Sequence, residues 1–195
     1  MHILVYTLIL VTSQVFQSAP SRAQPPSCTQ PLLYFDLGNT LLKTDFDSKS
    51  HQIKTVSYFP NVKSYLSQLK KNHFRMGLIV NLPEAWGKTR EAKITALKSF
   101  IKDHWVDARP MDWSDFELGI LVPENDLQRK PAPHLFLEAL ATAKREGCPA
   151  LYQGESQREI IAAQSAGMLA YEVSKSKKVS QSFLNVEQLR QFRAH

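Results

Sequence analysis

Residues 31–43 read PLLYFDLGNTLLK, a short apolar segment interrupted by a single carboxylate. The apolar run Leu32-Leu33-Tyr34-Phe35 ends at Asp36, and the turn-forming residues Gly38-Asn39-Thr40 follow. This pattern predicts a buried strand over Leu32–Asp36 that ends in a carboxylate and leads into a sharp turn. Ligands of open α/β sheets bind at the carboxyl ends of the strands. A turn-forming Asp without a function would produce the same pattern, so this segment alone leaves both interpretations open.

Downstream of this segment, apolar strands alternate with amphipathic helices. The other predicted strands are apolar almost throughout: Met76–Asn81, Leu118–Val122, Ala150–Gln153 and Leu169–Val173. One helix is predicted to open at Pro60-Asn61; the others cover about Thr89–His104, Lys130–Glu146 (stopped by Gly147), Gln157–Ala166 (capped by Ser156) and Asn185–Phe192. Thr44–Tyr58 is polar and is expected to be irregular. Strands without polar alternation are typical of a parallel sheet covered on both faces. The sequence therefore predicts an α/β fold with a five-stranded parallel sheet between two helical layers.

The length of 195 residues fits one domain with a sizeable core. A content of 43% hydrophobic and 22% charged residues is ordinary for a globular protein and argues against disorder. The net charge of +6 is spread along the chain, with its densest run at Lys175–Lys178, and no basic motif carries interleaved aromatic residues. We therefore expect no nucleic-acid partner. The expected domain covers residues 31–174, after a proline-rich lead-in at residues 24–30 and before a link and short helix at residues 175–195.

Residues 1–23 resemble a signal peptide. The apolar core Ile3–Val11 is too short to span a bilayer comfortably, and small residues at Ser21 and Ala23 fit cleavage before Gln24. Met1-His2 carries no Lys or Arg, so an uncleaved anchor or a buried strand is the alternative. Cleavage removes one positive charge, leaving 6 − 1 = +5. We expect an exported protein, secreted or periplasmic, with no stable membrane span; the oligomeric state is left open.

Polar groups follow several of the predicted strands at one edge of the sheet. Asp36 and Asn81 end the first two strands, Lys130 opens the helix after the third, and Gly154-Glu155 follows the fourth. Two carboxylates can hold a hard divalent cation such as Mg²⁺. An Asp beside Mg²⁺ and Lys stays ionised and can attack phosphorus, while the cation and the Lys neutralise the phosphoryl oxygens. Taken singly, these residues would be interpreted as turn formers or solvated surface groups.

Together they resemble the haloacid dehalogenase (HAD) superfamily of phosphohydrolases, whose four motifs occur in order over about Leu32–Val173. FDLGNTLL matches the first motif, GLIVN the second, RKPAPHLFLEAL the third and GESQREIIAAQSAGM the fourth. The resemblance implies a HAD-like Rossmannoid three-layer sandwich and Mg²⁺ as the cofactor. It implies that the catalytic residues are Asp36 (the nucleophile), Thr40, Asn81 and Lys130. The metal ligands it implies are Asp36, the backbone carbonyl of Gly38, and Glu155, with Glu159 in the second acidic place of the fourth motif.

The first motif departs from the family at Gly38, where the family has a second Asp that acts as the general acid and base. Loss of a positioned acid costs about 10²–10⁴-fold in rate, and less when the leaving group is an acyl or aryl phosphate. Asp45, Asp47 or His51 could replace it, although a solvated loop accounts for all three. We also expect Asn81 to keep a donor where the family has Ser or Thr, and Glu155 to lengthen the usual Asp by one methylene.

The spacing of the motifs leaves little room for a cap domain. Between Thr40 and Met76 we expect only a loop and one helix, and hence a minimal cap or none and an open site. Three tryptophans, Trp86, Trp105 and Trp113, lie in or beside the next segment. Trp86 could sit at the mouth of the site, but packing over a helix is the favoured interpretation for all three.

The same resemblance places both cysteines at the amino-terminal end of the sheet, because the strands of the first and fourth motifs are neighbours in this family. Cys28 precedes the first strand and Cys148 precedes the fourth. We therefore predict a Cys28–Cys148 disulfide, with two free buried thiols as the alternative.

The function predicted from these residues is Mg²⁺-dependent hydrolysis of a small phosphorylated substrate through an aspartyl-phosphate on Asp36. Gly38 supports an alternative, a protein that keeps the fold and binds metal or a phospho-ligand without turnover. A third possibility, dehalogenation through the same nucleophile, has no specific signal in the sequence.

Overall fold

The structure is a computed structural model that describes residues 28–50, 52–173 and 181–192. The expected signal peptide, the Lys175–Lys178 link and His51 all lie outside the described residues. Within the described ranges no helix is long and apolar enough to cross a membrane.

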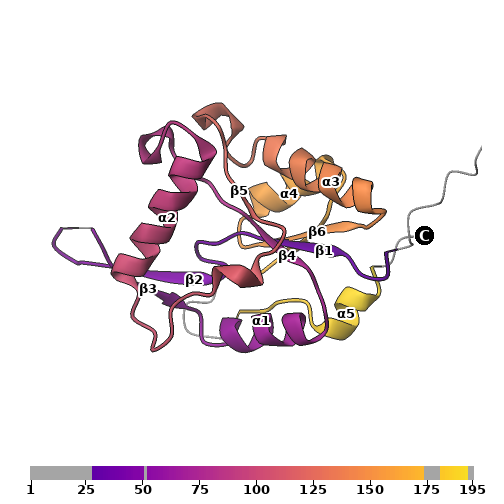
Figure 1. Cartoon of the computed structure of the whole chain (residues 1–195), viewed down its shortest axis with the longest axis horizontal. Coiled ribbons are helices and arrows are strands. Elements are labelled where there is room, and N and C mark those ends of the chain that lie inside the picture. Colours follow the sequence, from indigo (N-terminus) through magenta and orange to yellow (C-terminus); the bar gives the residue numbers. More distant parts are fainter. Residues whose placement is uncertain (1–27, 51, 174–180, 193–195) are drawn as a thin grey trace, which may run out of the picture.

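The centre of the molecule is a five-stranded sheet in the order β5-β4-β1-β6-β7, with every neighbouring pair parallel (Figure 1). Its strands are β1 (Leu32–Phe35), β4 (Met76–Ile79), β5 (Ile120–Leu121), β6 (Ala150–Gly154) and β7 (Leu169–Glu172). The strand of the first motif is central, and its carboxyl end is flanked by the ends of β4 and β6. The predicted five-stranded parallel sheet is confirmed, with four strands shorter than expected and β6 longer by one residue.

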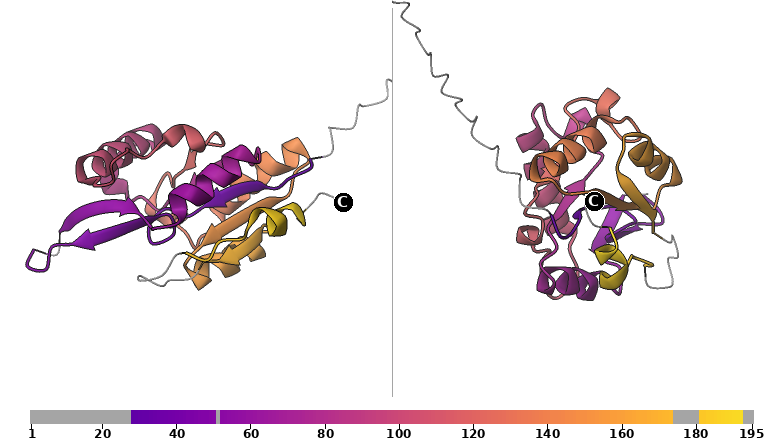
Figure 2. Two further views of the ribbon diagram at one scale, coloured as in Figure 1. Left: turned by 90° about the horizontal axis from the view of Figure 1, so that it is seen from below. Right: turned by 90° about the vertical axis from the view of Figure 1, so that its right-hand side faces the viewer.

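Helices cover both faces of this sheet (Figure 2). They are α1 (Val62–Lys71), α2 (Arg90–His104), α3 (His134–Glu146), α4 (Gln157–Ser165) and α5 (Val186–Arg190). Short 3-10 helices lie at η1 (Glu84–Trp86), η2 (Trp113–Asp115) and η3 (Asp126–Gln128).

The burial of β1 explains why its sequence does not alternate. Leu33 and Phe35 pack into the half of the core that holds residues of α1, α2 and α5. Leu32 and Tyr34 point to the opposite face, into the half that holds residues of α3 and α4. Since successive side chains of a strand face opposite sides, a strand covered on both faces must be apolar at every position.

Thr44–Tyr58 is not irregular, and that prediction was wrong. It forms most of an antiparallel hairpin of β2 (Leu42–Phe46) and β3 (Ile53–Tyr58), which extends from the carboxyl edge of the sheet (Figure 1). Thr44 pairs with Val56, and Val56 is buried while its neighbours Thr55 and Ser57 are partly exposed. The short polar alternation of a half-buried strand was therefore mistaken for a loop.

The hairpin also corrects the expectation of only a loop and one helix between Thr40 and Met76. In the described ranges no separate cap domain is present, as expected, but the hairpin stands beside the edge where the motif residues meet.

Several helix ends follow the predicted signals, but α3 begins at His134, four residues after the predicted opening at Lys130. Gly147 ends α3 with φ 68°, a left-handed conformation that favours glycine, and Thr89 caps α2 by accepting a hydrogen bond from the Ala92 N–H. Ser156 occupies the cap position of α4, but its side chain makes no capping hydrogen bond.

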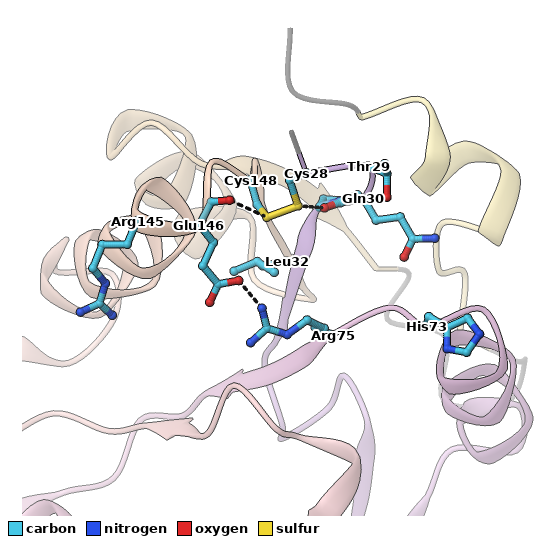
Figure 3. Close-up of a pocket in the computed structure, with 10 residues that line it drawn as sticks. Cys28, Thr29, Gln30, Leu32, His73, Arg75, Arg145, Glu146 and Cys148 are labelled. Atoms are coloured by element: carbon cyan, nitrogen blue, oxygen red, sulfur yellow. Dashed lines mark hydrogen bonds and ion pairs between the residues drawn. A yellow bond between two sulfur atoms is a disulfide. The ribbon is translucent and has the colours of Figure 1, made fainter. Parts of the chain in front are cut away.

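A disulfide joins Cys28 to Cys148, as predicted, with the two Cα atoms 4.9 Å apart (Figure 3). Cys28 precedes β1 and Cys148 precedes β6, and these strands pair from Leu32 and Ala150 onward. The disulfide therefore lies at the amino-terminal end of the sheet. A cavity of about 470 Å³ beside it contains Arg75, which pairs with Glu146, but none of the motif residues.

The described C-terminal residues 181–192 belong to the core. Phe183 stacks on Tyr65 with ring centroids 4.4 Å apart, and Leu184 and Leu189 are buried. Buried Gln153 of β6 accepts a hydrogen bond from the Leu184 N–H at 3.1 Å. The predicted last helix is thus confirmed as α5, and the segment before it packs tightly against the sheet.

Candidate active site

Asp36 lies at the carboxyl end of β1, where its backbone N–H donates to Gln153 of β6. Its side chain is only 12% exposed and is held at both oxygens. Lys130 Nζ donates to Oδ1 at 2.5 Å, and the Thr40 hydroxyl donates to Oδ2 at 3.3 Å. The carboxylate is thus fixed in orientation by one cation and one hydroxyl, from the third and first motifs respectively.

Lys130 brings a positive charge into the interior of the site, with a side chain that is 0% exposed. Besides Asp36, its Nζ pairs with Glu159 of α4 at 2.9 Å and donates to the Tyr152 hydroxyl at 3.0 Å. Burial alone would lower the pKa of Lys130, but the two carboxylates outweigh burial and raise that pKa above its ordinary value. The ammonium therefore stays charged.

Tyr152 of β6 is a member of the site that the sequence does not reveal. Its hydroxyl accepts from Lys130 and donates to Glu159 at 2.6 Å. Burial and the nearby negative charges of Asp36 and Glu159 raise the pKa of Tyr152 well above its ordinary value, so the phenol stays neutral. In the sequence, Tyr152 appears only as one more large residue in a buried strand.

Asn81 follows β4 and binds the backbone of Lys130 at both ends of its amide. Its Oδ1 accepts from the Lys130 N–H at 2.7 Å, and its Nδ2 donates to the Lys130 carbonyl at 2.9 Å. The structure therefore brings Asn81 to the site, where it fixes the segment that carries the lysine. The side-chain amide has a second hydrogen, which remains available to a ligand in the cavity that Asn81 lines.

Thr40 connects the first motif to the fourth. Its hydroxyl accepts a hydrogen bond from the Glu155 N–H at 3.1 Å and also lies 3.5 Å from Oε2 of Glu155. Burial, and then the negative charge of Asp36, raise the pKa of Glu155 above its ordinary value. The carboxylates of Asp36 and Glu155 thus both lie within 3.5 Å of the Thr40 hydroxyl, and both are only partly accessible to water.

The donor set of these residues fits a hard divalent cation. Charge repulsion between Asp36 and Glu155 would be relieved by a cation between them, and carboxylate and carbonyl oxygens are the ligands that Mg²⁺ prefers. No group of three or more His, Cys, Asp or Glu able to hold a metal occurs among the described residues. The predicted set of two carboxylates and the Gly38 carbonyl does not require one, because Mg²⁺ usually keeps several waters.

Gly38 lies in the exposed turn between Asp36 and Thr40. A Cβ added at this position would meet no atom within 4 Å, and its φ does not lie in the left-handed region. Neither the backbone nor the surrounding space therefore requires glycine at this position.

A cavity of about 320 Å³ opens beside Asp36, Gly38 and Asn81. Its walls come from the hairpin, η1 and α2, all at the carboxyl edge of the sheet (Figure 1). The lining side chains from these three elements are Leu42, Thr44, Ile53, Val56, Trp86, Leu97, Phe100 and Ile101. Trp86 both lines this cavity and packs against Phe100, with ring centroids 5.3 Å apart, so it satisfies both interpretations of its position.

The other two tryptophans do not line this cavity. Trp105 packs edge-on against Tyr58, with its indole N–H donating to the Arg109 carbonyl. Trp113 lies beneath the ammonium of Lys98. Trp105 and Trp113 therefore act as packing residues, as the favoured interpretation expected.

Of the candidate replacements for the missing acid, neither Asp45 nor Asp47 lines the cavity beside Asp36, and His51 lies outside the described residues. Asp45 pairs with Lys43 at 3.0 Å and lines a different cavity, of about 350 Å³, that also contains Glu155. Asp47 accepts hydrogen bonds from the N–H groups of Lys49 and Ser50 in the hairpin turn.

Comparisons with known proteins give similar folds but no close relative. No family model matches the chain, and no curated protein matches it in sequence. An uncharacterized protein from Listeria monocytogenes serotype 4b superposes with a TM-score of 0.52 at 21% identity, over 80% of this chain and 84% of its own. A HAD-superfamily hydrolase from Ehrlichia chaffeensis superposes with a TM-score of 0.51 at 16% identity, over 85% and 97% of the two chains. A HAD family enzyme from Bacteroides thetaiotaomicron, crystallised with magnesium and inorganic phosphate, gives 0.49 at 12% identity, over 76% and 96%. The first two similarities show a shared fold.

Proposed function

We propose that this chain, whose fold is that of the HAD superfamily, is a phosphohydrolase with Asp36 as its nucleophile. The observation that carries the proposal is the carboxylate of Asp36, held between Lys130 and Thr40 at the carboxyl edge of a parallel sheet and open to a cavity. Such an arrangement orients a carboxylate beside a cation, as nucleophilic attack on phosphorus requires.

The reaction proceeds in two transfers. A carboxylate oxygen of Asp36 attacks phosphorus, and the bond from phosphorus to the leaving oxygen breaks, with that oxygen keeping the electron pair. Water then attacks the phosphorus of the aspartyl-phosphate. The bond between phosphorus and the Asp36 oxygen breaks, which releases inorganic phosphate and restores the carboxylate.

Lys130 and Asn81 stabilise the charge that develops during the transfers. The buried ammonium of Lys130 lies beside the attacking carboxylate, where it attracts phosphoryl oxygens. The remaining N–H of the Asn81 amide donates to another phosphoryl oxygen. Glu159 and Tyr152 hold the ammonium in place and contact no substrate in this proposal.

Asp36, Glu155 and the Gly38 carbonyl would hold Mg²⁺. When bound, the metal supplies Lewis-acid stabilisation of the phosphoryl oxygens and relieves the repulsion between the two carboxylates. Thr40 fixes the positions of the Asp36 and Glu155 carboxylates relative to each other, because its hydroxyl contacts both.

Gly38 favours a second candidate, a protein that binds a phospho-ligand without turning it over. Among the residues that the structure describes, Asp36 itself is the one acidic group lining the cavity beside it, so no other described carboxyl group could protonate a leaving oxygen there. Substrates with poor leaving groups would then bind without reaction.

Hydrolysis of phenyl phosphate with and without Mg²⁺ tests the first candidate. We expect metal-dependent turnover in the parent protein and none in Asp36→Asn. Turnover that survives Asp36→Asn would contradict the mechanism. A parent without turnover, together with activity in Gly38→Asp, would favour the binding protein.

We also propose that the protein acts in an oxidising compartment outside the cytosol. The Cys28–Cys148 disulfide supports this, since such bonds persist in exported proteins and are rare in the cytosol. Recovery of the protein from its native source with both thiols free would contradict it.

A further inference from the structure

We propose that the cavity between the hairpin, η1 and α2 binds the leaving group, and that the substrates are aryl phosphates, the phosphate monoesters of phenols. The inference rests on the proposed function of Asp36 and names the substrate class of that site.

The walls of the cavity select for an apolar group. The hairpin contributes Ile53 and Val56, whereas Trp86 comes from η1 and Leu97 and Phe100 come from α2. Within residues 28–50, 52–173 and 181–192, no Lys, Arg, His or Glu lines it. A leaving group with several hydroxyls or a charge, such as a sugar or an amino acid backbone, would lose its hydration there and would gain few hydrogen-bond partners, such as the Thr44 hydroxyl.

The size of the cavity suits an aromatic ring. An apolar protein cavity of about 150 Å³ is large enough for benzene. The cavity beside Asp36 measures about 320 Å³, which accommodates one ring with a substituent. Asp36, Asn81 and Gly38 gather where β1 and β4 end, and the hairpin adds one polar lining residue, Thr44. A bound ester therefore has its phosphoryl group at the strand ends and its ring among the largely apolar walls.

The second, independent observation is the missing acid at Gly38. When the P–O bond breaks, the leaving oxygen takes the electron pair. A phenol has a pKa of about 10, so its anion departs without a proton. An alkoxide is about as basic as hydroxide, whose conjugate acid, water, has a pKa of about 15.7, and it needs an acid in the transition state. A site without that acid therefore turns over aryl esters and discriminates against alkyl esters.

A binding experiment tests the pocket without relying on catalysis. Calorimetry with Mg²⁺ present compares phenylphosphonate with methylphosphonate, two non-hydrolysable anions that differ only in the ring. Burial of a ring of this size predicts about 10- to 100-fold tighter binding of phenylphosphonate. Equal affinities would overturn the inference, whatever the protein hydrolyses.

Two variants of the walls and one matched control assign the difference to this cavity. In Trp86→Ala the preference for phenylphosphonate should fall toward parity. It should also fall in Ile53→Ser, a second lining variant, in the hairpin, which keeps the inference testable if Trp86→Ala does not fold. Trp113→Ala removes the same side chain outside the cavity and should keep the full preference. A preference that persists in both wall variants would contradict the assignment.

Turnover of two matched esters tests the role of the leaving group. Phenyl and cyclohexyl phosphate are similar in size and apolar character but differ in the basicity of the leaving oxygen. We expect the parent to hydrolyse only the phenyl ester at a useful rate. Gly38→Asp should raise the rate on the cyclohexyl ester by about 10²–10⁴-fold, with a smaller effect on the phenyl ester.

Comparable rates on both esters in the parent would overturn the aryl preference while leaving the proposed function intact. If neither ester nor any other phosphate were hydrolysed, the proposed function would fail, and the phosphonate comparison would still decide whether the cavity recognises an aromatic ring.

Discussion

Lys130 is the residue on which the stability of the site depends most. It is fully buried and pairs with both Asp36 and Glu159. Replacement by Met would leave two carboxylates in a buried position without a cation. Removal of one partner from a buried ion pair costs about 3–5 kcal/mol, and we expect Lys130→Met to lower the free energy of unfolding by about that much. Urea denaturation measures the difference.

Lys70→Met is the matched control for this prediction. Lys70 pairs with Asp115 on the surface of α1, and its side chain is 59% exposed. Exposed pairs contribute little, so the control should lose much less stability than Lys130→Met. Equal losses of unfolding free energy in the two variants would show that the buried ion pairs of Lys130 contribute no more to stability than an exposed pair.

Substitution by alanine is expected to affect the free energy of unfolding very differently at Gly38 and at Gly77. A Cβ at Gly38 meets nothing within 4 Å, whereas a Cβ at Gly77 would lie 2.9 Å from the Tyr34 ring. Gly38→Ala should therefore change the free energy of unfolding by less than about 0.5 kcal/mol. Gly77→Ala should lose about 1–3 kcal/mol, because the sheet must shift to admit the methyl group. A large loss in Gly38→Ala would mean that glycine is needed there for structural reasons.

At the residue scale, the sequence predicted which side chains meet but not how each one is used. Asp36, Lys130 and Glu155 were placed by motif spacing and by the rule that parallel strands share one carboxyl edge, and the structure brings them together. The hydrogen bonds of Asn81 to the Lys130 backbone, and the part played by Tyr152, depend on contacts between segments far apart in the chain. No local pattern encodes such contacts, so they could not be predicted.

At the scale of elements, one buried side-chain amide, that of Gln153, joins the C-terminal segment to the sheet. Gln153 of β6 accepts from the Leu184 N–H and donates to the Tyr65 hydroxyl at 3.0 Å. In Gln153→Leu the buried Leu184 N–H would lack a partner, which costs about 1–3 kcal/mol. We expect the amide of Leu184 to lose protection in hydrogen exchange, ahead of the amides of β1.

The control is Gln164→Leu, the same chemical change at an exposed position of α4. It should leave both the exchange of Leu184 and the free energy of unfolding nearly unchanged. Unaltered protection of Leu184 in Gln153→Leu would contradict this role of Gln153.

The elements that the sequence predicted well are those with long, consistent signals. The apolar strands and the helix α1, with its buried Val62, Tyr65, Leu66 and Leu69, were predicted close to their observed positions. The hairpin of β2 and β3 was missed because only one face of it is buried and its strands are rich in polar residues. That omission mattered, since the hairpin supplies a wall of the proposed leaving-group pocket.

At the scale of the whole molecule, the disulfide and the candidate site lie at opposite ends of the sheet. The Cys28–Cys148 bond closes a loop with a sequence separation of 120 residues. In the chain-entropy model such a closure stabilises the fold by about 2–5 kcal/mol. Cys28→Ala/Cys148→Ala should therefore unfold at lower temperature, while turnover per folded molecule stays close to that of the parent.

Thermal unfolding with and without a reductant, followed by an activity assay well below the transition, checks this prediction. A loss of turnover in the folded double variant would mean that the two ends of the sheet are coupled.

The resemblance to the HAD superfamily, predicted from four motifs, is confirmed at the level of the fold, and the disulfide predicted from that resemblance is also present.

The covalent state of Asp36 during turnover is the most informative quantity to measure. The protein is incubated with phenyl phosphate and Mg²⁺, quenched in acid, and examined by peptide mass spectrometry. We predict one added phosphoryl group on the peptide that contains Asp36, and none in Asp36→Asn or in protein without substrate. Rapid hydrolysis with no phosphoryl group on Asp36 at any quench time, or with the group on another residue, would contradict the nucleophilic role of Asp36.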